Sequence, residues 1–251
     1  MNLNRIIPCL LIEENKILKT KKFQSPEYVG DPKNTIKLFN EMNCSEIIIL
    51  DIGLTKQNKE IDYEFLKNIV SEAFMPVSYG GGVKNLNDIN KLLNIGCEKI
   101  SLNTKSYDYK FIENSVKMFG GSSLIISLDI IKVENNIFCY NYLENKITNQ
   151  TIQERLEKIN SYNVGEYFIN FVNKDGTMTG YDIETIEKIL KLTNSQITFC
   201  GGASSYKNIQ KTLLSGAKSL AAGSLFIYQS LGSGVLINFP DGNEYLEMLE
   251  I

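Results

Sequence analysis

The chain has 251 residues, 43% hydrophobic and 22% charged, which is the composition of a globular protein long enough for one large core. Its net charge of −3 and sequence pI of about 5.3 come from interspersed acidic and basic residues, and this excludes the basic stripe or tail of a nucleic-acid-binding protein. No apolar run approaches the length of a membrane span, so we expect no membrane partner.

The cysteines and histidines restrict the chemistry. The five cysteines are odd in number and never paired at metal-ligand spacing, which favours a reduced, cytoplasmic protein with neither a metal site nor a cofactor. The chain contains no histidine, and this excludes HExxH zinc sites, Ser-His-Asp triads and Cys-His dyads. Acid–base chemistry must therefore use carboxylates, Lys, Tyr or Cys.

The first half of the chain alternates strands and helices. Residues 5–12 form an apolar run that contains Pro8 and has no cleavage site, so it predicts a strand and not a signal peptide. The residues between this strand and Asp31 show no periodicity and predict a long mobile loop. Helices are predicted at 31–43, 61–73 and after the glycine pair 81–82, and strands at 46–52, 77–79 and 99–102.

The second half continues the alternation. Ser106 is the expected cap of a helix to residue 119, strand 123–129 follows, and residues 137–142 predict a short hairpin. Thr151 and Glu154 form a predicted capping box, residues 166–171 a strand, and Asp182 the cap of the next helix.

An internal repeat completes the pattern. Residues 77–104 resemble residues 197–224, and the two copies align without a gap from Gly81 and Gly201, 120 residues apart. Each copy predicts a strand, a glycine pair, a helix and a second strand. The chain then has eight strands and no linker, which predicts one (β/α)₈ TIM-barrel domain over residues 1–251, built of two similar half-barrels; a flavodoxin-like fold needs fewer units.

The repeated loops indicate a ligand. A glycine pair after a strand is either a tight turn or a loop whose backbone N–H groups hold a phosphate. Small residues end the second strand of each copy, namely Asn103 and Thr104 in one and Gly223 and Ser224 in the other. Because equivalent loops face each other across a barrel, a substrate with a phosphate at each end would fit.

Charged residues mark both ends of the predicted strands. Asp51, Asp129 and Asp175 lie at or after strand ends, where Asp51 is either a functional group or a helix cap, and the inward parity of Asp129 predicts a carboxylate in the barrel mouth. The strand starts carry inward-facing charges that form either a ring of salt bridges or a gate: Arg5, Glu46, Lys99 and Glu166.

These residues resemble the cyclase subunit of imidazole glycerol phosphate synthase, HisF, over nearly the whole chain. The motifs that carry the resemblance are RIIPCL (5–10), GDP (30–32), LDI (50–52), GGG (80–82), Lys99, Asn103-Thr104, DGT (175–177), GYD (180–182) and the last Gly-Gly pair. The resemblance implies a HisH-like glutaminase bound at the strand starts, with Glu98 at the rim of the contact, and ammonia that passes the charged gate and crosses the barrel past Cys9, Ser78 and Ser101.

The resemblance also implies a small phosphorylated substrate and its binding residues. Phosphate contacts are implied for Gly82, Asn103, Thr104, Asp175, Gly176, Gly202, Gly223 and Ser224, and catalytic roles for Asp129 and Lys19. The family uses a second catalytic aspartate at the end of the first strand, where this chain has Leu11. Residues 232–240 (GSGVLINFP) stand where the family has its last amphipathic helix.

These departures resemble HisF-like paralogues that accompany sugar amidotransferases in surface-polysaccharide pathways, where an acetamido group becomes an acetamidino group. The first hypothesis is therefore an ammonia-handling synthase subunit that works with a glutaminase and supplies a sugar amidotransferase. The alternatives are the orthodox cyclase-lyase of histidine biosynthesis and a barrel without activity that activates or scaffolds the glutaminase. Leu11 argues against the first alternative, and the retained phosphate loops argue against the second.

Overall fold

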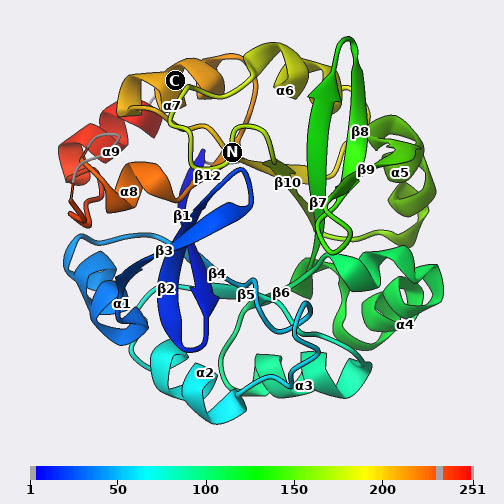
Figure 1. The fold of residues 1–251 in the computed structure, drawn as a ribbon, viewed down its shortest axis with the longest axis horizontal. Helices are drawn as coiled ribbons and strands as arrows, with labels where there is room; N and C mark the ends of the chain where they lie inside the picture. The colour runs from blue at the N-terminus through cyan, green and yellow to red at the C-terminus, as the bar shows by residue number, and fades with distance from the viewer. Residues whose placement is uncertain (1–3, 230–233, 250–251) are drawn as a thin grey trace.

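The computed structural model describes residues 4–229 and 234–249, and its centre is a closed barrel of parallel strands (Figure 1). Pairing runs in the order β10-β11-β12-β1-β4-β5-β6-β7, and β7 pairs with β10 to close the ring. The barrel strands are β1 (Arg5–Glu13), β4 (Ile47–Asp51), β5 (Val77–Gly80), β6 (Lys99–Leu102), β7 (Leu124–Val133), β10 (Glu166–Phe171), β11 (Gln196–Cys200) and β12 (Ser219–Ala222). The predicted (β/α)₈ fold is confirmed.

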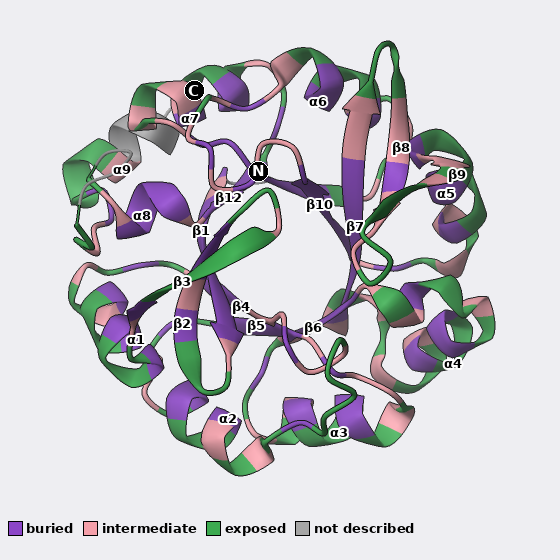
Figure 2. Cartoon of the chain, viewed as in Figure 1, coloured by how far each residue is buried: buried purple, intermediate pink, exposed green. Residues whose placement is uncertain are grey.

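Helices surround the barrel, and their buried faces turn toward the strands (Figure 2). They are α1 (Pro32–Glu41), α2 (Tyr63–Val70), α3 (Leu86–Asn94), α4 (Tyr109–Phe119), α5 (Ile152–Ile159), α6 (Ile183–Leu190), α7 (Tyr206–Leu214), α8 (Ser224–Ile227) and α9 (Gly242–Leu249), with 3-10 turns η1 (Thr104–Tyr107), η2 (Gly121–Ser123) and η3 (Asn160–Tyr162). The side chains of Asp31, Thr151 and Asp182 cap α1, α5 and α6, as predicted. In the described part of the chain, no helix has the length and apolar character needed to cross a bilayer.

The two repeat copies have the same backbone geometry. Gly81 and Gly201 follow β5 and β11 with φ values of 119° and 105°, which only glycine adopts without strain. Helices α3 and α7 are both nine residues long, and each is followed by a glycine with φ 107°, Gly96 or Gly216. The alignment of the sequence copies therefore corresponds to an equivalence in structure.

The expected mobile loop after β1 is wrong. The segment forms a hairpin of β2 (Lys16–Lys21) and β3 (Gln24–Gly30), and β2 pairs with the end of β1. Its pattern was hidden because β3 is mostly exposed, contains Pro26 and shifts register against β2. Thr20 Oγ1 and the Phe23 N–H donate to Asp175 Oδ2 at 2.7 and 3.2 Å, so the hairpin is held against the loop after β10.

Two other local expectations need correction. The cap of α4 is Asp108, whereas Ser106 lies in the preceding turn η1. The predicted hairpin at 137–142 is one strand of a larger insertion, in which β7 continues beyond the barrel and pairs with β8 (Asn136–Asn141), which pairs with β9 (Lys146–Thr151).

The C-terminal stretch does not replace the last helix. Gly232 and Ser233 lie outside the described residues, and residues 234–240 are not helical. Helix α9 follows them and lies against α7, with its Tyr245 ring 5.6 Å from the Phe239 ring. The interpretation of residues 232–240 as a substitute for the last helix is therefore wrong.

We predict that Thr20→Val loosens the β2–β3 hairpin. Valine keeps the shape but removes the hydroxyl that donates to the buried Asp175 carboxylate, and leaving such a group short of a donor costs about 1–3 kcal/mol. Amide hydrogen exchange in β2 and β3 should accelerate, with little change in α6 or α7. Ser71→Ala, at an exposed hydroxyl that also donates, is the control, and unchanged exchange in the hairpin would contradict the prediction.

Candidate functional site

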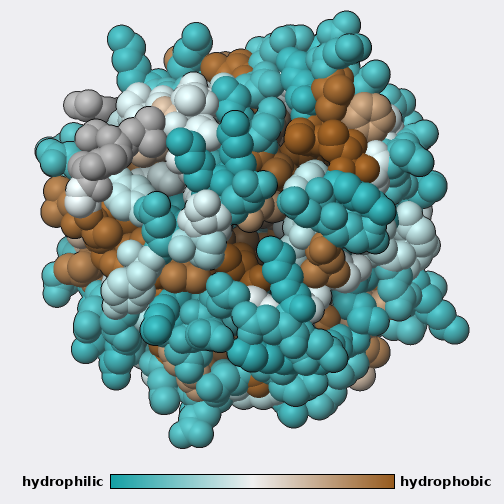
Figure 3. Space-filling view, viewed as in Figure 1, coloured by the Kyte–Doolittle hydropathy of each residue, from teal (hydrophilic) through white to brown (hydrophobic). Residues whose placement is uncertain are grey.

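A pocket opens at the face where the barrel strands end. In the space-filling view of this face, the centre is hollowed and hydrophobic atoms lie beside the hollow within a largely hydrophilic rim (Figure 3). Predicted site residues that line the pocket are Cys9, Lys19, Ser101, Asn103, Asp129, Asp175, Gly176, Gly202, Gly223 and Ser224. Leu11 lines it as well, so the structure brings most of the predicted mouth residues together.

Asp129 extends from β7 into this pocket with 7% of its surface exposed. Its Oδ2 accepts a hydrogen bond of 2.8 Å from Asn103 Nδ2. Burial raises the pKa of Asp129 to about 7, the Asn103 hydrogen bond works against that rise, and the Asp175 charge adds to it. A carboxyl that titrates near neutral pH can both accept and donate a proton under ordinary conditions.

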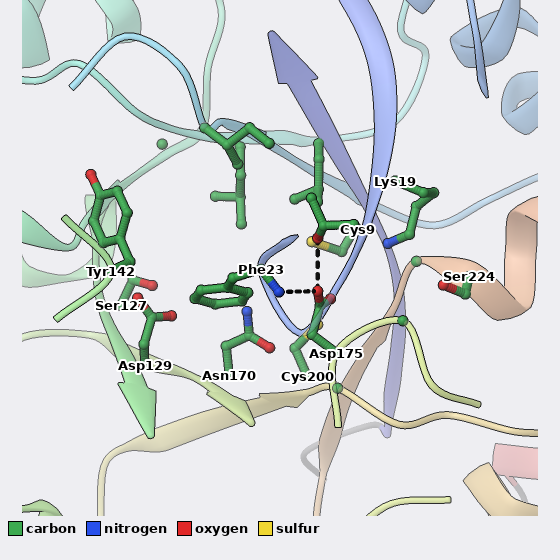
Figure 4. Close-up of a pocket in the computed structure, with 18 of the residues that line it drawn as sticks. Cys9, Lys19, Phe23, Ser127, Asp129, Tyr142, Asn170, Asp175, Cys200 and Ser224 are labelled. Atoms are coloured by element: carbon green, nitrogen blue, oxygen red, sulfur yellow. Dashed lines mark hydrogen bonds between the residues drawn. The ribbon is translucent and has the colours of Figure 1, made fainter. Parts of the chain in front are cut away.

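Lys19 lies on the opposite side of the pocket, near Ser224 (Figure 4). It belongs to β2 and is only 6% exposed, and in the described part of the chain its Nζ forms no ion pair or hydrogen bond. A Cβ placed on Gly223 would stand 2.2 Å from Nζ, so the glycine lets the ammonium lie against the backbone. A buried ammonium without a partner favours the binding of an anion at this side of the pocket.

Asp175 has a structural position in the same wall. Figure 4 shows the hydrogen bonds that it accepts from the β2–β3 hairpin, and these place the Phe23 ring over the centre of the pocket. The neighbouring Gly176 has φ 67°, and a Cβ there would stand 2.1 Å from the Thr20 carbonyl oxygen. The DGT segment therefore fixes the hairpin through both a carboxylate and a close backbone approach.

Three predicted residues do not line the pocket. The Gly82 N–H donates to Thr55 Oγ1 at 3.3 Å, and Thr104 Oγ1 lies 3.3 Å from the Tyr142 hydroxyl. Ser78 lies lower in the barrel wall, where Lys99 is its partner in β6. Asp51 does line the pocket, and its Oδ1 accepts from the N–H groups of Gly53 and Leu54 in the loop after β4. The interpretation of Asp51 as a helix cap is wrong, because the cap of the next helix, α2, is Asp62.

The four predicted charges at the strand starts form one connected group. Arg5 Nε and Nη2 donate to both carboxylate oxygens of Glu46 at 2.6 Å, and Nη1 donates to Glu166 at 3.0 Å. Lys99 Nζ donates to Glu166 Oε2 at 2.7 Å. Burial alone would raise the pKa of Glu166, but Arg5 and Lys99 lower it overall, so the 2% exposed carboxylate stays charged.

The barrel interior between this charged group and the pocket is mostly apolar. Its buried hydrophobic residues are Ile7, Cys9, Leu11, Ile48, Ile125, Phe168, Cys200 and Ala221, and the buried Ser101 and Ser127 line its pocket end. A hydrogen bond with Cys9 and burial both raise the pKa of Cys200, so its thiol is uncharged at neutral pH. An uncharged lining therefore separates the charged group at the strand starts from the pocket at the strand ends.

Several pocket residues escaped the sequence analysis. Thr20 and Phe23 were missed because their segment lacks strand periodicity, and Tyr142 because it follows β8 in the insertion. Asn170 could have been found, since it shares the inward parity of Glu166 and Phe168 in β10; it is buried and its Oδ1 has no hydrogen-bond partner. In the described residues no group of three or more His, Cys, Asp or Glu side chains is placed to hold a metal ion.

Comparison with known proteins gives a consistent family. A family model described as "Histidine biosynthesis protein" matches residues 5–232. The chain is 35% identical to the "Putative imidazole glycerol phosphate synthase subunit HisF" of Leptospira borgpetersenii, over 96% of each chain, and 36% identical to the hisF2 protein of the same description from Pseudomonas aeruginosa, over 96% of this chain and 97% of that one. It is 34% identical to the imidazole glycerol phosphate synthase subunit HisF of Helicobacter hepaticus, over 90% and 91% of the two chains. The chain therefore belongs to the histidine biosynthesis protein family, among the HisF proteins and their paralogues.

Proposed function

We propose that this chain is the HisF-like synthase subunit of a glutamine amidotransferase. It receives ammonia from a HisH-like glutaminase at the strand-start face and delivers it through the barrel for the amidination of a surface-polysaccharide sugar. The observation that carries the proposal is the ion-paired group of Arg5, Glu46, Lys99 and Glu166 at one end of a barrel whose other end opens into the pocket that Lys19 and Asp129 line. The relatives named as HisF subunits of a synthase support a glutaminase partner.

The charged group suits a gate that opens only in a complex. Passage requires Arg5 or Lys99 to move away from Glu166, and removing one partner from a buried ion pair costs about 3–5 kcal/mol. A docked partner that offers replacement contacts would offset this cost. The two cations are neutralised by the two carboxylates, so ammonium finds no free counter-ion there and would be costly to bury, whereas neutral ammonia can enter the apolar interior above them.

Exposed hydrophobic side chains support docking at this face. Phe74 is 88% exposed and lies between α2 and the start of β5, while Met118 and Leu214 are exposed at the ends of α4 and α7, just before β7 and β12. Because each helix of the barrel ends beside the start of the next strand, these side chains surround the strand-start end. The exposed Glu98, next to Lys99, would lie at the rim of such a contact.

The pocket suits chemistry with a single acid–base carboxylate. Asp129 could take the proton that an attacking ammonia must lose, since its pKa is about 7. Leu11 makes part of the opposing wall apolar, and the Asp175 carboxylate is occupied by the hairpin. This arrangement does not favour a ring closure that moves protons at more than one site.

The orthodox cyclase is the second candidate function. The near-neutral pKa of Asp129 and the similarity to the Helicobacter hepaticus subunit favour it. The third alternative, a scaffold without activity, gives no reason for the unpaired Lys19 in the pocket.

We predict that Phe74→Asp weakens a one-to-one complex with the cognate HisH-like glutaminase at least about tenfold, because an exposed aromatic anchor is replaced by a charge. Calorimetric titration and the glutaminase rate measure the effect. Leu143→Asp, a similar change at an exposed leucine of the β8–β9 turn, is the control and should leave binding unchanged. Absence of any complex with the unaltered chain would refute the partner assignment.

We predict that phosphate binds beside Lys19, Gly202, Gly223 and Ser224 and raises the melting temperature. A ligand at 100 times its dissociation constant stabilises the folded state by about 2.7 kcal/mol. Lys19→Met should remove the effect, Ser224→Ala should reduce it only slightly because backbone N–H groups carry much of the contact, and Lys16→Met on the exposed side of the same strand should keep it. Equal stabilisation of the Lys19 and Lys16 variants would count against this site.

We predict that the natural protein has little cyclase activity. Losing a positioned acid–base group costs a factor of about 10² to 10⁴ in rate, and Leu11 stands where the family has its second aspartate. Turnover of the histidine-pathway substrate with ammonia should therefore be slow, and Leu11→Asp should increase it. A turnover of about 1 per second or more by the unaltered chain would establish the cyclase instead.

A further inference from the structure

Arg155 is a charged side chain in a fully buried position. It lies in α5, is 0% exposed, and has no carboxylate partner in the described part of the chain. Its guanidinium carbon is 4.0 Å from the centre of the Tyr107 ring and 5.3 Å from that of Tyr109. A buried guanidinium without a counter-ion is costly unless its donors are used, so their partners indicate what it organises.

Its two terminal nitrogens donate to the segment that follows β6, while Nε is buried without a hydrogen-bond partner. Nη2 donates to the Ser106 carbonyl oxygen at 2.5 Å and to Ser106 Oγ at 2.9 Å, and Nη1 donates to the Tyr109 hydroxyl at 2.9 Å. Ser106 belongs to η1, which begins directly after Asn103. Arg155 therefore holds the turn from behind and is not itself among the residues that line the pocket.

The donor and the acceptor of each hydrogen bond between Arg155, Ser106 and Asn103 are fixed. A guanidinium can only donate, so Ser106 Oγ accepts from Arg155 and directs its own hydrogen elsewhere. That hydrogen goes to the Asn103 carbonyl oxygen at 2.6 Å, which also accepts from the Ser106 N–H at 2.9 Å. The Asn103 backbone, with φ −100° and ψ −81°, is held in an irregular conformation by these bonds.

Asn103 carries the contact into the pocket, since its Nδ2 donates to Asp129 Oδ2 at 2.8 Å. We propose that Arg155 is a positioning residue for the Asp129 carboxyl and acts through Ser106 and Asn103. The positioning itself holds for any reaction in the pocket; only its consequence for turnover rests on the proposed role of Asp129.

The pKa of Asp129 can report whether Arg155 positions its carboxyl. The titratable groups that influence it or are influenced by it are Asp175, Tyr107, Cys139 and Tyr140, and Arg155 is not among the causes of its raised pKa. Because the Asn103 hydrogen bond stabilises the charged carboxylate, its loss must raise the pKa of Asp129 further. If Arg155 had only a structural role, replacing it would lower the stability of the protein but would leave the pKa of Asp129 unchanged.

The test is a carboxyl titration by NMR in the full chain labelled with ¹³C-aspartate, with the Asp129 signal identified by Asp129→Asn. Asn103→Ala should raise the pKa of Asp129 by about one unit. Arg155→Met and Ser106→Ala should raise it in the same direction, and Arg155→Lys, which keeps the charge but not the forked geometry, should not restore it. In the double variant Asn103→Ala with Arg155→Met, the rise should equal that of Asn103→Ala alone.

The control is Ile159→Ala, which creates a cavity at a buried position of the same helix without touching the turn. It should destabilise the protein and leave the titration of Asp129 unchanged. If Arg155→Met does not fold, Ser106→Ala and its double variant with Asn103→Ala decide the question. An unchanged pKa in the Arg155 or Ser106 variants, or a rise that adds fully to that of Asn103→Ala, overturns the proposal whether or not the proposed function is correct.

Discussion

One buried carboxylate, that of Glu166, connects the strands of the barrel at the end where they start. Glu166 accepts from Arg5, Lys99 and Thr198, so a single side chain of β10 is connected to β1, β6 and β11. Arg5 also binds Glu46, which stands directly before β4. Each of these donors is needed to satisfy the buried carboxylate. The positions of the strands that carry them therefore depend on one another.

The opposite end of the barrel distributes its charges differently. Asp175 is also buried, but a hydroxyl and a backbone N–H satisfy it, so no cation is needed there. Lys19 consequently has no carboxylate partner, although it lies in the same hairpin as Thr20. One end of the barrel is internally neutralised, and the other presents a cation, which is the asymmetry expected of a structural end and a ligand-binding end.

Much of this arrangement could be predicted from the sequence, because it depends on local signals. Strand parity placed Asp129 inside the barrel and the four charges at its other end, and the glycine pairs marked turns with positive φ. The β2–β3 hairpin could not be predicted, since it is stabilised by Asp175, 152 residues from Phe23. Arg155 was equally hidden, because a charged residue on an amphipathic helix is ordinarily exposed and its partners lie 46 and 49 residues away.

The absence of histidine gives the raised pKa of Asp129 a thermodynamic consequence. No side chain of this protein has an ordinary pKa between 5 and 8, while burial raises that of Asp129 from 3.8 to about 7. Between these values the folded chain holds a proton that the unfolded chain has released, so folding takes up a proton there. This contribution to the stability falls as the pH rises through that range, by at most about 4 kcal/mol. The same buried carboxyl that can transfer a proton in the pocket thus makes the folded protein less stable toward its alkaline side.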